Sequence, residues 1–209
     1  MLHLVRHGEA VGNAEKRLLG HIDSPLTERG IRQAQGLRRL FGPQVKVARV
    51  VTSPLERARR TAEALGFDVP IDVDDRWIEV DYGRFDGELL SEVPAKVWQS
   101  WRMDPSYRPE GGETLAELGN RVRAACEELF SLSGQGARAE GGEGDVVVVS
   151  HVSPIKAAVG WALGADDSIA WRLWLATASL TEIGWGAGTN TPVLHRYNVV
   201  SPSDESDLT

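Results

Sequence analysis

Four consecutive valines, residues 146–149, limit the possible fold more than any other stretch of the chain. A short run of β-branched residues without a polar position predicts a strand that is buried on both faces. Strands of this kind are typical of parallel sheets that helices cover on both sides. The apolar run at residues 2–5 predicts a second buried strand. The chain is therefore expected to form an α/β fold around a mostly parallel central sheet.

The remaining segments alternate between strand and helix patterns, as that fold requires. Further strands are expected at residues 45–51, 69–73, 177–185 and 192–199, and helices at 27–41, 54–66, 91–102, from 114, and at 153–164. Helix starts are indicated by a Thr27 cap and by two capping boxes, Ser53 with Glu56 and Thr114 with Glu117. The first of these helices is expected to bury a face that includes Ile31. Residues 76–87 and the glycine-rich residues 133–145 are interpreted as loops, and the latter lack the Gly-Lys-Ser/Thr of a phosphate cradle.

Length and composition limit the class of protein. A chain of 209 residues with 42% hydrophobic and 25% charged residues fits one globular domain, expected at residues 1–200, with a polar, disordered tail at 201–209. The net charge of −7 disfavours general nucleic-acid or membrane-surface binding. No leader or membrane-length apolar run is recognised, so a cytoplasmic protein is expected. Cys126, the single cysteine, is expected to be a small buried hydrophobe.

Residues suited to chemistry follow both buried strands. Arg6 and His7 come directly after the first, and Ser150 and His151 come directly after the valine strand. Ligands of such sheets bind beyond the carboxyl ends of the strands, so both histidines are expected in one site. A guanidinium beside an imidazole suits the binding of an oxyanion and attack on it.

Six segments together resemble the histidine phosphatase superfamily, the phosphoglycerate mutase-like proteins. They are Arg6-His7-Gly8-Glu9 with Asn13; Asp23-Ser24-Pro25-Leu26-Thr27 with Gly30; Ser53-Pro54-Leu55-Glu56-Arg57-Ala58; Glu79-Val80-Asp81-Tyr82-Gly83 with Gly87; Gly111-Gly112-Glu113-Thr114; and Ser150-His151. Their order is that of the family, and the match spans roughly residues 2–160. The resemblance implies a three-layer αβα sandwich and a phosphohistidine intermediate.

The resemblance also assigns residues to roles. The implied catalytic residues are His7, Glu79, His151, Arg6 and Arg57, and the implied substrate-binding residues are Arg6, Asn13, Gly20, Arg57, His151 and Val152. His7 would take the phosphoryl group, and Glu79 would give a proton to the leaving oxygen and later remove one from water. No cofactor is expected. No metal is expected either, because His3 and His7 have the i,i+4 spacing of zinc ligands only on a helix, and this segment is a predicted strand.

The proposed roles agree with the charge of the substrate. A phosphate monoester is close to a dianion at neutral pH, and two guanidinium groups can bind its oxygens bidentately. His151 would add a cation if it is protonated, and the helix start near Pro54 is expected to favour the anion. Partial burial would favour a protonated Glu79 and the positive cluster would oppose this, so the sequence leaves that balance open.

Three functions remain open from the sequence: hydrolysis, mutase-type phosphoryl transfer, and phosphoester binding without catalysis. The modest insertion between Glu79 and His151, and the segment at residues 80–87, resemble the phosphatase branch. A metal-independent phosphatase acting on small phosphorylated metabolites is therefore preferred. The sequence His151-Val152-Ser153-Pro154-Ile155-Lys156 is similar to α-ribazole-phosphate phosphatase-like proteins, but sugar phosphates, phosphoglycerate and other monoesters stay open as substrates.

Several residues have two interpretations each. Aromatic and basic residues between 77 and 108 would form either a substrate wall under a lid or core packing: Trp77, Trp98, Trp101, Tyr107, Arg102 and Arg108. Trp161, Trp171 and Trp174 would form either a homodimer face or core. Glu9 would either orient a donor or serve the structure. His21 and His195 are interpreted as surface or hydrogen-bonded histidines, with His21 near enough in sequence to approach a substrate.

Overall fold

The computed structural model describes residues 1–133, 144–186, 189 and 191–201. Within these residues, six strands form one sheet in the order β3-β2-β4-β1-β5-β6. The strands are β1 (Leu2–Arg6), β2 (Val47–Thr52), β3 (Ile71–Val73), β4 (Asp145–Ser150), β5 (Ser179–Trp185) and β6 (Pro192–Val200). Strands β1 to β4 are parallel, and β5 pairs antiparallel with β1 and β6. The predicted α/β class and the mostly parallel sheet are confirmed.

The valine strand β4 lies between β1 and β2 and is buried on both faces, as predicted. Val146 and Val148 pack into one hydrophobic cluster, whereas Val147 and Val149 pack into another on the opposite face. This division follows from the two-residue period of a strand. Leu4 of β1 pairs in register with Val148, so the two central strands end side by side.

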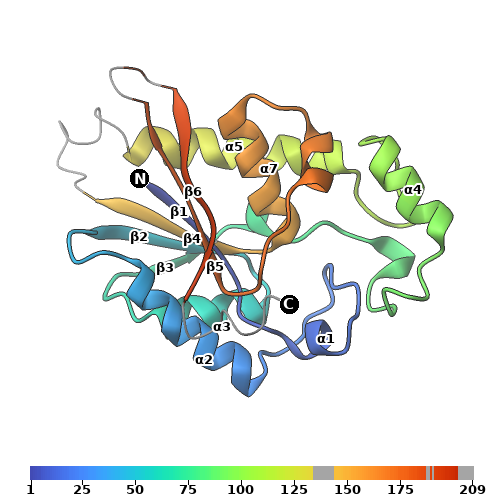
Figure 1. Ribbon diagram of the computed structural model, residues 1–209, viewed down its shortest axis with the longest axis horizontal. Helices are drawn as coiled ribbons and strands as arrows, with labels where there is room; N and C mark the ends of the chain where they lie inside the picture. Colours follow the sequence, from blue (N-terminus) through green and yellow to red (C-terminus); the bar gives the residue numbers. More distant parts are fainter. Residues whose placement is uncertain (134–143, 187–188, 190, 202–209) are drawn as a thin grey trace.

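Helices cover both faces of the sheet and give the three predicted layers (Figure 1). Helices α2 (Glu28–Leu37) and α3 (Glu56–Leu65) lie on one face, and α5 (Leu115–Ser133) and α7 (Val152–Leu163) lie on the other. Helix α4 (Ala95–Met103) lies beyond the end of the sheet where β1 and β4 finish, on the right of Figure 1. The short elements are α1 (Val11–Ala14) and the 3-10 turns η1 (Arg38–Leu40), η2 (Asp75–Trp77), η3 (Gly83–Phe85) and η4 (Asp167–Arg172).

Two of the three predicted helix caps are present. The Thr27 hydroxyl accepts a hydrogen bond from the Gly30 amide at 2.9 Å. Thr114 and Glu117 form the reciprocal capping box, with both backbone amides bound at 3.0 Å. The box predicted for Ser53 is wrong, because α3 begins three residues later, at Glu56, with Leu55 as its N-cap.

Other local predictions also require correction. Ile31 is 44% exposed, and the buried face of α2 uses Gly30 and Gln33 in its place. Helix α4 begins only after Pro94, because a proline disfavours helical geometry in the residue before it. Cys126 is buried as predicted, and burial raises the pKa of its thiol. Ser201, assigned to the tail, is buried.

Some predictions fall partly or wholly outside the described residues. The glycine-rich loop predicted at residues 133–145 lies mostly among the residues 134–143, which are outside them, as are 202–209 of the predicted tail. No helix among the described residues is long and apolar enough to cross a bilayer. The single domain at residues 1–200 stays a prediction.

Candidate active site

His7 lies at the carboxyl end of β1, where its backbone amide continues the pairing with β4 by donating to Ser150 at 3.0 Å. The ring is 3% exposed, and its Nδ1 lies 2.7 Å from the Gly8 carbonyl oxygen. Because a carbonyl only accepts, Nδ1 carries the hydrogen, and in the neutral ring Nε2 keeps its lone pair. Burial lowers the pKa of His7, and the nearby charges of Arg57 and Arg6 lower it further. The neutral, nucleophilic ring is therefore the favoured form.

The turn that carries His7 touches the start of α2 backbone to backbone. A Cβ atom on Gly8 would lie 2.3 Å from the Gly30 carbonyl oxygen, and one on Gly30 would lie 2.0 Å from the Glu9 carbonyl oxygen. Side chains at either position would push the two segments apart. The two glycines of separate motifs thus serve one contact, which fixes the position of the His7 backbone.

His151 lies at the end of β4 and is the N-cap of α7. Its ring meets the His7 ring edge to face, with centroids 5.0 Å apart, so the predicted pairing of the two histidines is confirmed in space. The Nε2 atom lies 2.7 Å from the Ser53 hydroxyl, and the buried Nδ1 has no partner among the described residues. Burial lowers the pKa of His151, and the charge of Arg57 lowers it further. The ring is therefore neutral in the free protein, and the positive charge that a protonated His151 would add is absent there.

Arg6, which is half-buried, and Arg57, which is fully buried, bring two guanidinium groups to the same place. Arg6 donates to the Leu175 carbonyl at 2.6 Å, and Arg57 donates to the Ile22 and Gly20 carbonyls at 2.9 and 2.7 Å. The Nε atoms of both arginines are buried without a partner in the described part of the chain. Burial lowers the pKa of Arg6 to about 10 and also lowers that of Arg57. Both remain charged at neutral pH, and a desolvated cation with an unused donor favours the binding of an anion.

Glu79 is 4% exposed and lies between η2 and η3. Its Oε1 accepts hydrogen bonds from its neighbour Val80 at 2.9 Å and from the Ser153 amide at 3.1 Å. Ser153 is the second residue of α7, so the carboxylate lies at the helix N-terminus directly after His151. Glu79 and His151 therefore share one end of the sheet although His151 comes 72 positions later in the chain.

The helix N-terminus expected to favour the anion is occupied by the protein itself. The Glu56 amide, at the start of α3, donates to both carboxylate oxygens of Asp23, at 2.9 and 3.1 Å. The helix start near Pro54 thus binds an anion, the carboxylate of the protein's own Asp23, and binding of a substrate anion there stays a prediction. Arg57, in the first turn of that helix, reaches the site with its side chain instead.

The three further substrate-binding predictions have different surroundings. The Asn13 Oδ1 accepts from the Ala10 amide at 3.0 Å, which leaves its amide nitrogen available as a donor. The Gly20 carbonyl accepts from Arg57, and a Cβ atom there would lie 2.8 Å from the Val80 carbonyl oxygen. Val152 is half-buried and lines a pocket described below. Their contact with a substrate stays a prediction.

Two supporting residues were missed by the sequence reasoning. Ser53 was expected to cap a helix, but its hydroxyl binds His151. Arg121 of α5 donates to the carbonyls of Arg76, Ile78 and Glu79 at 2.6, 2.8 and 3.1 Å, and it pairs bidentately with Glu113. Its position in the middle of a helix gives no local signal of this role. The Arg121 guanidinium thus fixes the backbone that carries Glu79.

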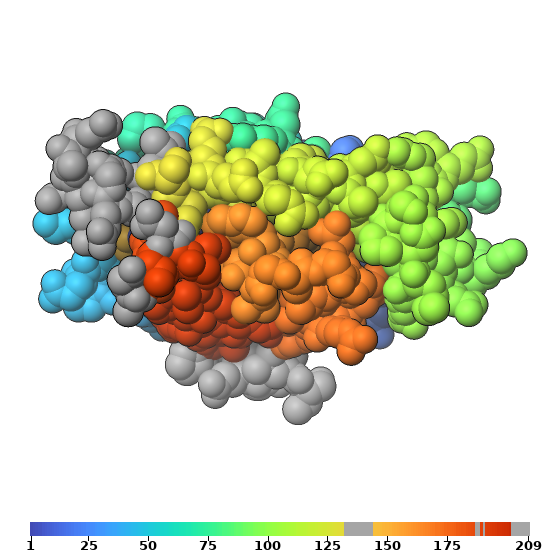
Figure 2. Space-filling view, turned by 90° about the horizontal axis from the view of Figure 1, so that it is seen from above, coloured from blue at the N-terminus to red at the C-terminus, as the bar shows by residue number. Residues whose placement is uncertain are grey.

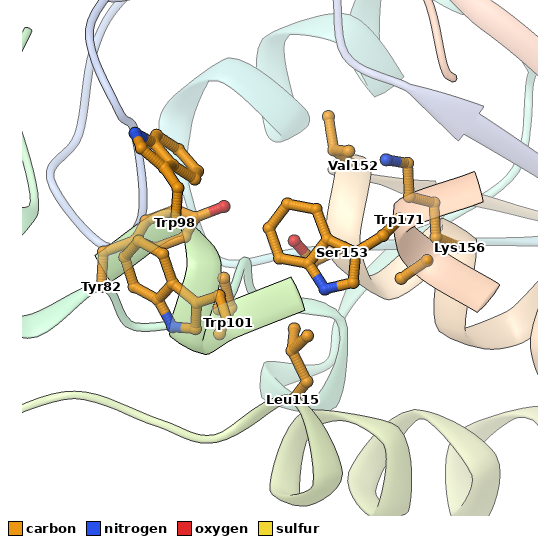
Figure 3. A pocket seen from close by; sticks show the side chains of 10 residues that line it. Tyr82, Trp98, Trp101, Leu115, Val152, Ser153, Lys156 and Trp171 are labelled. Carbon is orange, nitrogen blue, oxygen red and sulfur yellow. The ribbon is translucent and has the colours of Figure 1, made fainter. Parts of the chain in front are cut away.

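The aromatic residues divide between core and pocket. Trp77 is fully buried in the cluster that includes α5 and α7, and Trp101 is 3% exposed at the centre of a smaller cluster with Tyr107. Trp98 and Trp101 both line a pocket of about 110 Å³ (Figure 3). The full lining is Val80, Tyr82, Trp98, Trp101, Leu115, Val152, Ser153, Lys156, Ala170 and Trp171. This segment thus contributes both to the core and to the lining of a pocket, and its role as a substrate wall stays a prediction.

The remaining predicted residues lie in structural contacts. Glu9 binds the Thr27 hydroxyl at 2.8 Å and Arg29 at 2.7 Å, which favours its structural interpretation. His21 donates to the Glu79 carbonyl at 3.0 Å, so it lies beside the site. His195 is exposed on β6, as predicted.

His3 is buried, and the tryptophans of the possible dimer face differ in their exposure. His3 is buried between Glu182 and Asp145, at 3.1 and 3.0 Å. Trp161 packs on the core, and Trp174 is 62% exposed. The homodimer stays a prediction.

Comparison with known proteins gives a consistent result. The family model described as the histidine phosphatase superfamily (branch 1) matches residues 2–199. The bifunctional protein Rv2228c of Mycobacterium tuberculosis is 34% identical over 187 residues, which cover 86% of this chain and 49% of that protein. The chain therefore spans about half the length of this relative. Phosphoserine phosphatase 1 of Hydrogenobacter thermophilus is 35% identical over 189 residues, covering 87% of this chain and 85% of that protein.

Solved structures agree on the fold. The α-ribazole phosphatase of Shigella flexneri superposes with a TM-score of 0.76 at 24% identity, and the match covers 95% of this chain and 96% of that one. At this identity the similarity concerns the fold alone. The six motifs, the sheet order and the paired histidines thus all point to the same group of proteins.

Proposed function

Because the chain belongs to the histidine phosphatase superfamily, we propose that it hydrolyses phosphate monoesters of small molecules through a phosphohistidine on His7. One observation carries the proposal: the His7 Nδ1–H is bound to the Gly8 carbonyl, so the lone pair is on Nε2. The lowered pKa of His7 keeps that ring neutral, as a nucleophile must be.

The first step transfers the phosphoryl group to the protein. Nε2 of His7 bonds to phosphorus while the bond from phosphorus to the ester oxygen breaks. Arg6 and Arg57 offset the charge of the phosphoryl oxygens with the guanidinium groups that burial leaves short of partners. The neutral His151 ring offers one further hydrogen bond, and a bound dianion would favour its protonated form. Positioning and charge stabilisation supply most of the rate enhancement in such transfers.

Glu79 serves as the proton donor and acceptor. In its protonated form it gives a proton to the leaving alkoxide, and as a carboxylate it then removes one from the water that attacks the phosphohistidine. The second step breaks the bond between Nε2 and phosphorus and releases inorganic phosphate. The Ser153 amide binds the carboxylate at the start of α7, directly after His151, and this position supports the use of one group for both transfers.

The test is release of inorganic phosphate from p-nitrophenyl phosphate and a panel of small monoesters without added metal. We expect turnover by the wild type and none by His7→Ala, with the exposed His195→Ala as the matched control that keeps activity. Rapid quenching of Glu79→Gln should accumulate an acid-labile, alkali-stable phosphoprotein. Turnover by His7→Ala equal to the wild type would refute the phosphohistidine.

Two alternatives give different results in the same experiments. A mutase would convert 3-phosphoglycerate to 2-phosphoglycerate faster than it releases phosphate, because it keeps the phosphoryl group on the histidine. A binding protein would hold the esters without either reaction. Hydrolysis without isomerisation is the expected result.

A further inference from the structure

A pocket opens beside the two groups that would handle the ester bond. Val80 follows Glu79 directly, Val152 and Ser153 follow His151 directly, and all three line the pocket. From above, the segment with α4 lies against the segment that carries α7 and η4 (Figure 2), and Trp98 and Trp171 join them edge to face with ring centroids 6.4 Å apart. The pocket therefore lies next to the proposed proton donor, where the leaving alcohol must be.

The walls of this pocket are apolar and flat. Figure 3 shows Tyr82, Trp98 and Trp101 on one side and Trp171 on the other, with Leu115 below. The Trp101 ring packs against two neighbouring rings, with centroid distances of 5.5 Å to Tyr82 and 5.3 Å to Trp98. The volume of about 110 Å³ is of the order of the protein cavities that hold a single benzene ring. Such walls favour a planar, apolar group over a strongly hydrated one.

One cation interrupts the apolar lining. Lys156 lies on α7, one turn after Ser153, and its side chain is half-buried. Among the described residues no carboxylate lies close enough to form an ion pair with its ammonium group, although Arg17, Arg29 and several other surface cations have such partners. Burial lowers the pKa of Lys156, whereas the charge of Glu79 opposes this shift. A half-buried cation without a partner gains more from a bound anion than an exposed one does.

We propose that the pocket binds the leaving alcohol and that Lys156 selects alcohols that carry an anionic substituent, such as a carboxylate, on a flat apolar body. This inference rests on the proposed function and names its substrate class. The phosphoryl group already has Arg6 and Arg57, whereas Lys156 lies among the pocket residues. Lys156 is thus a specificity-determining residue, and the reaction at phosphorus is unchanged.

The test compares esters that differ only in charge. We would measure kcat/KM for 3- and 4-carboxyphenyl phosphate against 3- and 4-carbamoylphenyl phosphate, in which an amide of nearly the same shape replaces the carboxylate. A hydrogen bond to a charged group predicts a preference of about 10- to 100-fold for at least one carboxylate. Lys156→Met should abolish the preference. Lys96→Met removes an exposed lysine from α4, so its net charge equals that of Lys156→Met, and it should keep the preference for the carboxylate.

The contrary outcomes are separable. Equal kcat/KM for both members of each pair in the wild type would overturn the role of Lys156, as would an unchanged preference in Lys156→Met. An equal loss for carboxylate and amide would place Lys156 at the phosphoryl group instead. If the wild type releases phosphate neither from the four esters nor from p-nitrophenyl phosphate and the panel of monoesters, the proposed function fails, and calorimetric binding of the same pairs to wild type and Lys156→Met still decides the inference.

Discussion

Replacement of Arg121 by methionine should destabilise the protein more than any other single charge removal considered above. Arg121 uses all five of its N–H donors: two for the Glu113 carboxylate, at 2.7 and 2.8 Å, and three for backbone carbonyls between Arg76 and Glu79. Methionine has a similar length but no donor. The change leaves one carboxylate and three carbonyls without their partners.

The magnitude follows from burial. Removing one partner of a buried ion pair costs about 3–5 kcal/mol, because the other charge stays desolvated. The Arg121 and Glu113 side chains are 19% and 18% exposed, so water can reach part of the gap and the lower end of that range applies. We expect a loss of about 3–4 kcal/mol in the free energy of unfolding, a large share of the 5–15 kcal/mol typical of a folded protein.

Urea unfolding followed by circular dichroism measures this loss. The matched control is Arg60→Met, which breaks an exposed pair with Glu63 and should cost at most about 1 kcal/mol. The loss of unfolding free energy in Arg121→Lys should lie between those of Arg121→Met and Arg60→Met. An ammonium group keeps the charge but cannot reproduce the planar fork of five donors. The double variant Arg121→Met with Glu113→Gln should be less destabilised than the sum of both changes, because no unpaired carboxylate remains.

The result that would refute this reasoning is a loss below about 1 kcal/mol for Arg121→Met, equal to that of the exposed control. The Arg121 contacts would then contribute no more than surface ion pairs do. If instead stability falls as expected, phosphate release by Arg121→Lys tests the link to Glu79. A lower kcat at unchanged KM is expected, because the backbone that positions the proton donor is looser.

Three further outcomes are expected. Burial lowers the pKa of His7 and His151 below the unfolded value of about 6.5, so their contribution to stability is full above that pH and is lost as the pH falls toward the folded pKa. His151→Asn should therefore reduce the pH dependence of the free energy of unfolding, measured in urea between pH 7 and 5, by up to about 1.4 kcal/mol per pH unit. An unchanged pH dependence would contradict the lowered pKa of His151. Gly30→Ala should lower the melting temperature and phosphate release together, whereas Gly42→Ala, whose Cβ meets nothing within 4 Å, should change neither; equal melting temperatures would disprove the backbone contact. Ser53→Ala should keep the fold but lower kcat about 10-fold, since it frees the His151 ring, and a wild-type kcat would exclude a positioning role.

Strand and helix patterns were predictable because they depend on local periodicity. The run of four valines needed no tertiary information to be recognised as a doubly buried strand, and the caps at Thr27 and Thr114 use partners three residues away. The capping box predicted at Ser53 failed for a tertiary reason. The Glu56 amide, which the box would use, donates to the carboxylate of Asp23, and the Ser53 hydroxyl lies 2.7 Å from the ring of His151, 98 positions later in the chain.

The site was predictable in part. His7 and His151 follow buried strands, and parallel strands bring their carboxyl ends together, so the sequence already implied that the two rings would lie close to each other. The sequence did not indicate that the carboxylate of Asp23, from another loop, would accept a hydrogen bond from the Glu56 amide at the start of α3. Proximity between two loops depends on packing, which no local pattern encodes.

The sequence by itself therefore determined the α/β class, the covered faces of the sheet and the meeting of the histidines, because the spacing of apolar residues and the end of each strand decide these. Only the tertiary structure decided the protonation of the His7 ring, the anchoring of the Glu79 backbone by Arg121, and the aromatic pocket with Lys156. The pKa of His7 depends on distant groups that exclude water and carry charge, and the other two features depend on contacts between residues far apart in the chain. Contacts of that kind are set by how the layers pack against one another, and no local sequence pattern specifies them.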